Sequence, residues 1–83
     1  MTDQTISKIA EETTGLLRKF LPGETASNII ASYNALLAAA RQNHPEDAFL
    51  SALTPIETTE SALDLAILFS QLRIALEAIG SEG

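Results

Sequence analysis

The single histidine of the chain, His44, is the first residue to consider for chemistry. A general base or a metal ligand needs convergent partners, and metal sites usually need three or more ligands. The nearby acids Glu46 and Asp47 follow Pro45 in a pattern that is typical of a helix start, so they point elsewhere. We therefore expect His44 to be a solvent-exposed residue between two helices, with no catalytic role and no metal site.

Three carboxylates, Glu57, Glu60 and Asp64, follow one another at three- and four-residue steps. On a helix this spacing places them on one face, where repulsion between like charges raises the pKa of a carboxyl if the site is buried. In the first turns of a helix, however, the macrodipole stabilises exposed carboxylates.

The four glycines are isolated and form no phosphate-binding loop. The sequence predicts a protein that is not an enzyme and holds no cofactor.

The elements that position these residues are predicted to be helices. Ala and Leu are abundant, and breakers between the helical segments occur at Pro22-Gly23, Asn43-His44-Pro45 and Thr54-Pro55. The breakers delimit helices over about residues 5–21, 24–42, 46–53 and 55–79, and residues 80–83 are a frayed tail or the start of a linker. The predicted fold class is all-α. Residues 1–83 form one domain, a small antiparallel bundle of three longer helices plus one short helix, joined by short loops.

Local signals set the expected helix ends. Asn43 is placed to be a left-handed C-cap of the second helix. The run Thr54-Pro55-Ile56-Glu57 combines a Thr N-cap, a Pro in the first turn and a Glu that closes a capping box. The fourth helix is therefore predicted to begin there and to end at Gly80.

This last helix has two hydrophobic stripes. At 100° per residue, one side carries Leu65, Phe69, Leu72, Leu76 and Ile79. The nearly opposite side carries Leu63, Ile67, Ile74 and Ala78. An ordinary surface helix needs only one such stripe, and a chain of 83 residues cannot easily cover both sides of so long a helix. We predict that the second stripe is an interface with another chain, and that the protein is a helical interaction module, a homodimer through these four residues.

The charge balance narrows the class of partner. Eleven acidic and five basic residues give a net charge of −6, which disfavours nucleic acid and anionic membranes as partners. No Lys or Arg lies between Arg41 and Arg73. This gap supports an alternative function, an acidic regulatory small subunit that docks a basic partner protein.

Another alternative is a small-ligand-binding bundle with a pocket lined by Tyr33, Phe20 or Phe69. The polar N-terminus resembles no secretory signal, and apolar runs such as residues 65–69 are far shorter than the ~20 residues of a membrane span. We therefore expect a cytoplasmic protein.

Overall fold

The computed structural model describes residues 1–21, 23–57 and 61–82, without the side chains of residues 81 and 82. Over these residues the chain is all-α, as predicted, with three longer helices and one short one. The helices are α1 (Asp3–Leu17), α2 (Ser27–Asn43), α3 (Ala48–Ala52) and α4 (Ala62–Glu82). An isolated bridge between Thr25 and Ser61 is the only β pairing within the described part of the chain.

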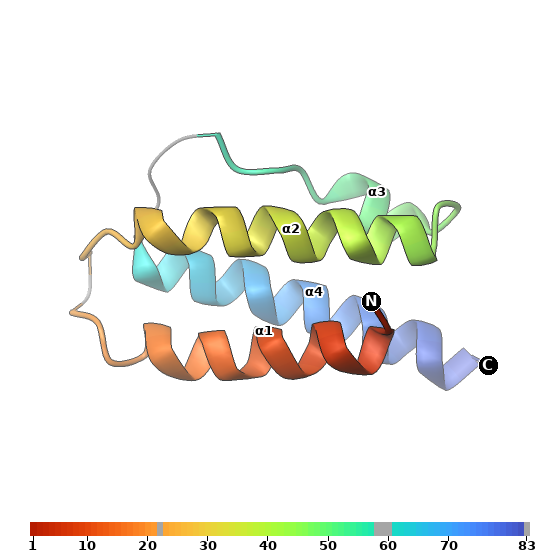
Figure 1. Ribbon diagram of the computed structural model, residues 1–83, viewed down its shortest axis with the longest axis horizontal. Coiled ribbons are helices and arrows are strands. Elements are labelled where there is room, and N and C mark those ends of the chain that lie inside the picture. Colours follow the sequence, from red (N-terminus) through yellow and green to blue (C-terminus); the bar gives the residue numbers. More distant parts are fainter. Residues whose placement is uncertain (22, 58–60, 83) are drawn as a thin grey trace.

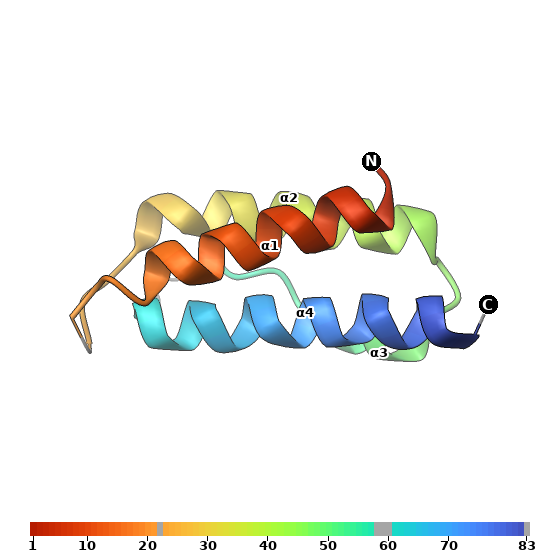
Figure 2. The ribbon, with the colours of Figure 1, turned by 90° about the horizontal axis from the view of Figure 1, so that it is seen from below.

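The three longer helices lie side by side along the long axis of the molecule. The extents are 38 × 22 × 18 Å, and α1 runs antiparallel to both α2 and α4 (Figure 1). The turned view places α1 and α2 on one broad side and α4, with α3 beside it, on the other (Figure 2). The most extensive packing is between α1 and α4. This leaves one face of α4 directed away from the other two long helices.

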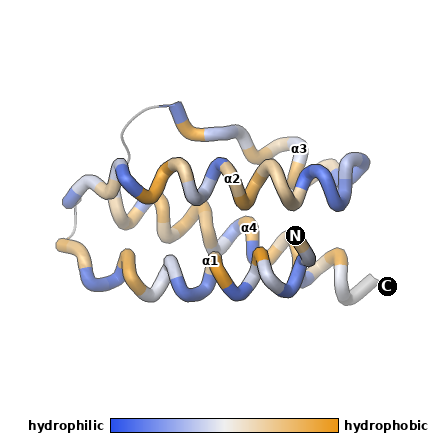
Figure 3. The backbone as a smooth tube through the Cα atoms, in the orientation of Figure 1, coloured by the Kyte–Doolittle hydropathy of each residue, from blue (hydrophilic) through white to orange (hydrophobic). Residues whose placement is uncertain are grey.

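The first helix forms for the reasons that its sequence suggests. Thr2 is the N-cap, because its Oγ1 accepts a hydrogen bond from Thr5 N at 3.2 Å. Hydrophobic and hydrophilic residues alternate along α1 (Figure 3), and the buried positions are Ile6, Ala10, Thr14 and Leu17. The Thr14 hydroxyl is satisfied within the helix, since it donates to Ala10 O at 2.7 Å.

The core lies between the buried faces of α1, α2 and α4. Tyr33 of α2 and Phe69 of α4 are both fully buried. Their rings pack edge to face, with centroids 5.4 Å apart and planes at 87°. The predicted inner stripe of the last helix is confirmed for its first four members, which are buried, and Ile79 is half-buried against the core. The buried members are Leu65, Phe69, Leu72 and Leu76.

The predicted start of the fourth helix is wrong. α4 begins at Ala62 rather than at residue 55, and the cap is formed by Ser61 and Asp64. Ser61 Oγ accepts from Asp64 N at 3.2 Å and donates to Asp64 Oδ2 at 3.0 Å. Thr54-Pro55 is compatible with a helix start, but residues 54–57 form no helix, because contacts from α2 hold this segment instead.

The extended segment, residues 53–57, is held in place by two side chains of α2. Asn34 Nδ2 donates to Ile56 O at 2.9 Å, and Ile56 N donates to Asn34 Oδ1 at 2.8 Å. Arg41 Nε donates to Leu50 O at 3.0 Å, and its Nη2 donates to the carbonyl oxygens of Ser51 and Leu53. These bonds satisfy backbone groups that a helix would otherwise satisfy.

Other predicted helix boundaries also need correction. α1 begins at Asp3 rather than at 5, α2 begins at Ser27 rather than at 24, and α3 spans Ala48–Ala52 rather than 46–53. α1 ends at Leu17 rather than at 21, because Lys19 N and Phe20 N bond to carbonyls three residues back. Asn43 is the last residue of α2 and is not a left-handed cap, since Gly23 alone of the described residues has a positive φ, of 83°. α4 continues through Gly80 to Glu82.

Candidate functional site

The most unusual surface of the molecule is the outer face of α4, formed by Leu63, Ile67, Ile74 and Ala78. Leu63 and Ile74 are each 61% exposed and Ile67 is 49% exposed. Ala78 is also exposed. These are the four residues that the sequence predicts as an interface. They lie opposite the buried stripe, and no other described segment covers them.

The hydrophobic surface continues from α4 towards α1. A shallow groove of about 370 Å³ runs between the two helices and is lined by Thr14, Arg18, Leu63, Ala66, Ile67, Ser70, Gln71 and Ile74. An adjoining pocket of about 250 Å³ shares Arg18, Leu63 and Ala66 with it. It adds Phe20 and Leu21 from the turn after α1, and Leu21 is 72% exposed. The outer face of α4 is therefore part of a wider apolar patch, which sequence periodicity within single helices does not reveal.

The two edges of this face carry different charges. On the α1 side, Arg18 lines the groove, and Arg73 makes ion pairs with Glu11 at 3.9 Å and Glu77 at 3.7 Å. On the other side, Asp64 lies four residues before Leu68, which faces the 53–57 segment. Glu57 is exposed in that same segment. The first edge thus carries two arginines together with the two glutamates that pair with Arg73, and Asp64 and Glu57 make the second edge acidic.

His44 is predicted to be solvent-exposed, but in the structure its side chain is partly buried and contacts another helix. Its side chain is 26% exposed, and its Nε2 lies 2.5 Å from Asp3 Oδ2. Asn43 Nδ2 donates to Asp3 Oδ1 at 3.1 Å and to Met1 O at 2.6 Å. Partial burial raises the pKa of the Asp3 carboxyl, but the bonds from His44 and Asn43 outweigh it, and the pKa falls below 3.8. The arrangement fastens the start of α1 to the end of α2.

This contact makes stability depend on pH. Because the folded state lowers the pKa of Asp3, the contact contributes stability above pH ~4, and the contribution is lost as the pH falls through the lowered value. We expect Asp3→Asn to be less stable than the wild type at pH ~6, with the difference closing towards pH ~2. Urea unfolding followed by circular dichroism measures the free energy of unfolding of the wild type and of Asp3→Asn at each pH. Glu12→Gln is the control on the same helix, with a change below ~0.5 kcal/mol at pH ~6. A difference that persists at the lowest pH would contradict this origin.

The three carboxylates at 57, 60 and 64 do not share a helical face. Glu57 lies in the extended segment and Asp64 in α4, while Glu60 is outside the described residues. No group of three potential metal ligands occurs among the residues that the structure places. The prediction of an aligned acidic face is therefore wrong at Glu57, because α4 begins later than expected.

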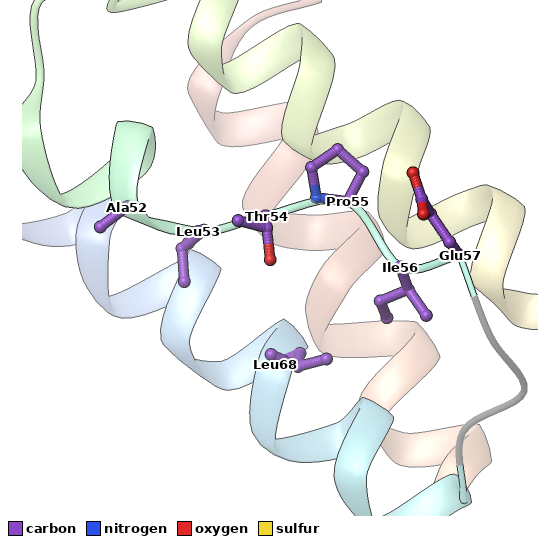
Figure 4. A pocket seen from close by; sticks show the side chains of 7 residues that line it. All are labelled: Ala52, Leu53, Thr54, Pro55, Ile56, Glu57 and Leu68. Atoms are coloured by element: carbon purple, nitrogen blue, oxygen red, sulfur yellow. The ribbon is translucent and has the colours of Figure 1, made fainter.

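A separate open pocket of about 710 Å³ lies beneath the extended segment, lined by Ala52, Leu53, Thr54, Pro55, Ile56, Glu57 and Leu68. The side chains of Leu53 and Ile56 point towards α4, where Leu68 faces them (Figure 4). Glu57 is the only ionisable group among these seven residues. The Thr54 hydroxyl is the other polar side-chain group in this lining, which is otherwise apolar.

The aromatic residues predicted to line a ligand pocket are placed differently. Tyr33 and Phe69 belong to the closed core and reach no pocket surface, whereas Phe20 lines the 250 Å³ pocket beside α4. The Tyr33 hydroxyl is buried without a hydrogen-bond partner among the described residues. Burial raises the pKa of this phenol, and the nearby charge of Arg41 counters part of that increase.

Comparison with known protein families, with characterised proteins and with solved structures finds no match for this chain. Over the described residues, none of the helices combines the length and the apolar character needed to cross a bilayer.

Proposed function

We propose that the protein is a non-enzymatic helical interaction module that forms a homodimer through the outer face of α4. The observation that carries this proposal is the exposure of Leu63, Ile67 and Ile74, which are 49–61% exposed on one side of one helix. Single exposed hydrophobic side chains are ordinary on a protein surface, but a contiguous row bordered by polar residues marks an interaction site.

The remaining surface supports other functions less well. Two of the acids in the stretch without basic residues act as helix caps: Asp47 accepts from Leu50 N at 2.9 Å, and Asp64 pairs with Ser61. Local structure therefore accounts for these charges without a basic partner.

The small size of the protein is a further argument for self-association, because a domain of 83 residues gains stability from burying additional apolar surface.

The test is the change Ile67→Glu. A carboxylate in the middle of the outer face would be desolvated in the dimer, so we expect dimerisation to weaken about 30-fold, or ~2 kcal/mol. Sedimentation equilibrium over a concentration series measures the dissociation constant. Circular dichroism should show an unchanged helix content, because Ile67 contributes little to the monomer core.

The matched control is Leu16→Glu. Leu16 is 54% exposed, but it lies two residues from both Thr14 and Arg18, and thus on the far side of α1 from the groove. This variant should dimerise like the wild type. A wild-type chain that sediments at 8.8 kDa throughout the series would refute the proposal, as would equal effects of the two variants.

A further inference from the structure

The area of the outer face sets a condition on any dimer. The 21 residues of α4 span about 31 Å, and a strip about 10 Å wide along this helix covers only about 300 Å². A stable interface of standard size buries about 800 Å² per partner. The whole broad face of the molecule, 38 × 22 Å, provides about that area. A stable dimer must therefore include both edges beside α4, and the charges on these edges must be compatible.

The two possible twofold arrangements bring different edges together. If the two α4 helices run antiparallel, each edge meets the same edge of the partner, so the two acidic edges with Asp64 and Glu57 face each other. If the helices run parallel, the α1 edge of one copy meets the acidic edge of the other. The antiparallel arrangement therefore brings two acidic edges together in chains that each carry a net charge of −6, whereas the parallel arrangement sets each acidic edge against the edge that carries Arg18 and Arg73.

Within the parallel arrangement, one pair of opposite charges lies at the same height along α4. Arg18 lines the groove beside Leu63. Asp64 follows Leu63 in the sequence and lies on the opposite edge of α4. Within the described residues, Arg18 makes no ion pair in the monomer, and the carboxylate of Asp64 is exposed. Twofold symmetry then repeats the contact, so that each copy supplies one arginine and one aspartate.

We propose that the partner of the outer face is a second copy of the chain with its α4 parallel, and that Arg18 of each copy pairs with Asp64 of the other. This inference rests on the proposed function and adds the direction of the helices and the specific pair. In this dimer Leu63, Ile67 and Ile74 would each pack against the same residue of the other copy.

The direction is tested by disulfide formation, because the chain has no cysteine of its own. Leu63→Cys should cross-link with itself under oxidising conditions in a parallel dimer. In an antiparallel dimer centred on the stripe, residue 63 lies about 22 Å from its copy, far beyond disulfide reach, and meets residue 78 instead. An equimolar mixture of Leu63→Cys and Ala78→Cys is the comparison, and in a parallel dimer it should yield no mixed disulfide.

The pair is tested by charge reversal. Arg18→Glu and Asp64→Arg should each weaken dimerisation about 5- to 10-fold, since symmetry repeats each change. The double variant should return to within about threefold of the wild type. Loss of the Ser61–Asp64 cap cannot produce this recovery, because the double variant lacks the cap as well.

The outcomes separate this inference from the proposed function. A monomeric wild type, or a dimer with no cross-link at residue 63 or 78, overturns both. A dimer that yields the mixed 63–78 disulfide leaves the proposed function in place and overturns the parallel arrangement. A dimer in which residue 63 cross-links to itself but the double variant fails to recover overturns the Arg18–Asp64 pair.

Discussion

Replacing Phe69 with alanine is expected to lower the free energy of unfolding by about 3–5 kcal/mol. Phe69 is fully buried and packs against the Tyr33 ring at 5.4 Å, so the change leaves a cavity and removes an edge-to-face contact. A domain of 83 residues has about 4–12 kcal/mol of stability in total. The variant therefore loses a quarter or more of the total stability, and its melting temperature should be lowered by about 15–30 °C.

The measurement is thermal and urea unfolding followed by circular dichroism. Working in the Ile67→Glu background removes any contribution from dimerisation. If Phe69→Ala does not fold at all, Phe69→Leu gives a measurable value, with an expected loss of about 1–2 kcal/mol. Phe49→Ala is the matched control, because Phe49 is 49% exposed and should cost less than about 1 kcal/mol. Similar losses at Phe49 and Phe69 would contradict the assignment of the core.

The helical periodicity of the last segment explains why much of the fold was predictable. Leu65, Phe69 and Leu72 repeat at the spacing of a single helix face, and burial of that face requires only that other helices exist to cover it. The opposite stripe follows from the same arithmetic, and its exposure in the monomer agrees with the shortage of chain to cover it. Its role as an interface stays a prediction.

The start of α4 was not predictable, because the deciding bonds come from elsewhere in the chain. Thr54-Pro55 suits a helix start and an extended segment equally well, and the choice is made by Asn34, which binds both backbone groups of Ile56 from 22 positions away. The cap that α4 does use, Ser61 with Asp64, is visible in the sequence as a Ser followed by an acid three residues later. Two competing local signals were thus present, and tertiary contacts selected the second.

The contact between His44 and Asp3 illustrates the same limit. The two residues are 41 positions apart and belong to different helices, so no spacing rule relates them. Their proximity follows from the antiparallel packing of α1 and α2, which brings the start of one beside the end of the other (Figure 1). A pattern within one helix predicts which face is buried, whereas pairs such as this one require the arrangement of the helices.

The second large effect is expected at Arg41, whose guanidinium joins α2 to α3 and to the extended segment. It donates to Leu50 O at 3.0 Å and to Ser51 O at 3.1 Å, and it also bonds Leu53 O. These carbonyls lie at the end of α3, where a helix leaves its acceptors without intrahelical donors. A planar guanidinium spreads its donors over three nitrogens in a fixed fork, whereas the three donors of an ammonium all come from one nitrogen and do not match these separated carbonyls. We expect Arg41→Gln to cost about 2–3 kcal/mol and Arg41→Lys nearly as much.

The loss at Arg41 should begin locally. The α3 helix has only five residues and few other contacts with the bundle, so without Arg41 it should open before the three long helices do. Hydrogen exchange at the Ile56 amide reports on this, because that amide is bonded to Asn34 only while the segment is in place. Exchange of this amide should accelerate about 10- to 100-fold in Arg41→Gln, because ~1.4 kcal/mol corresponds to a factor of ten. Exchange of the core amides of α4 should change less. Lys19→Gln, at an exposed position, should leave both unchanged. Uniform acceleration across all helices would show instead that α3 and the bundle unfold as one unit.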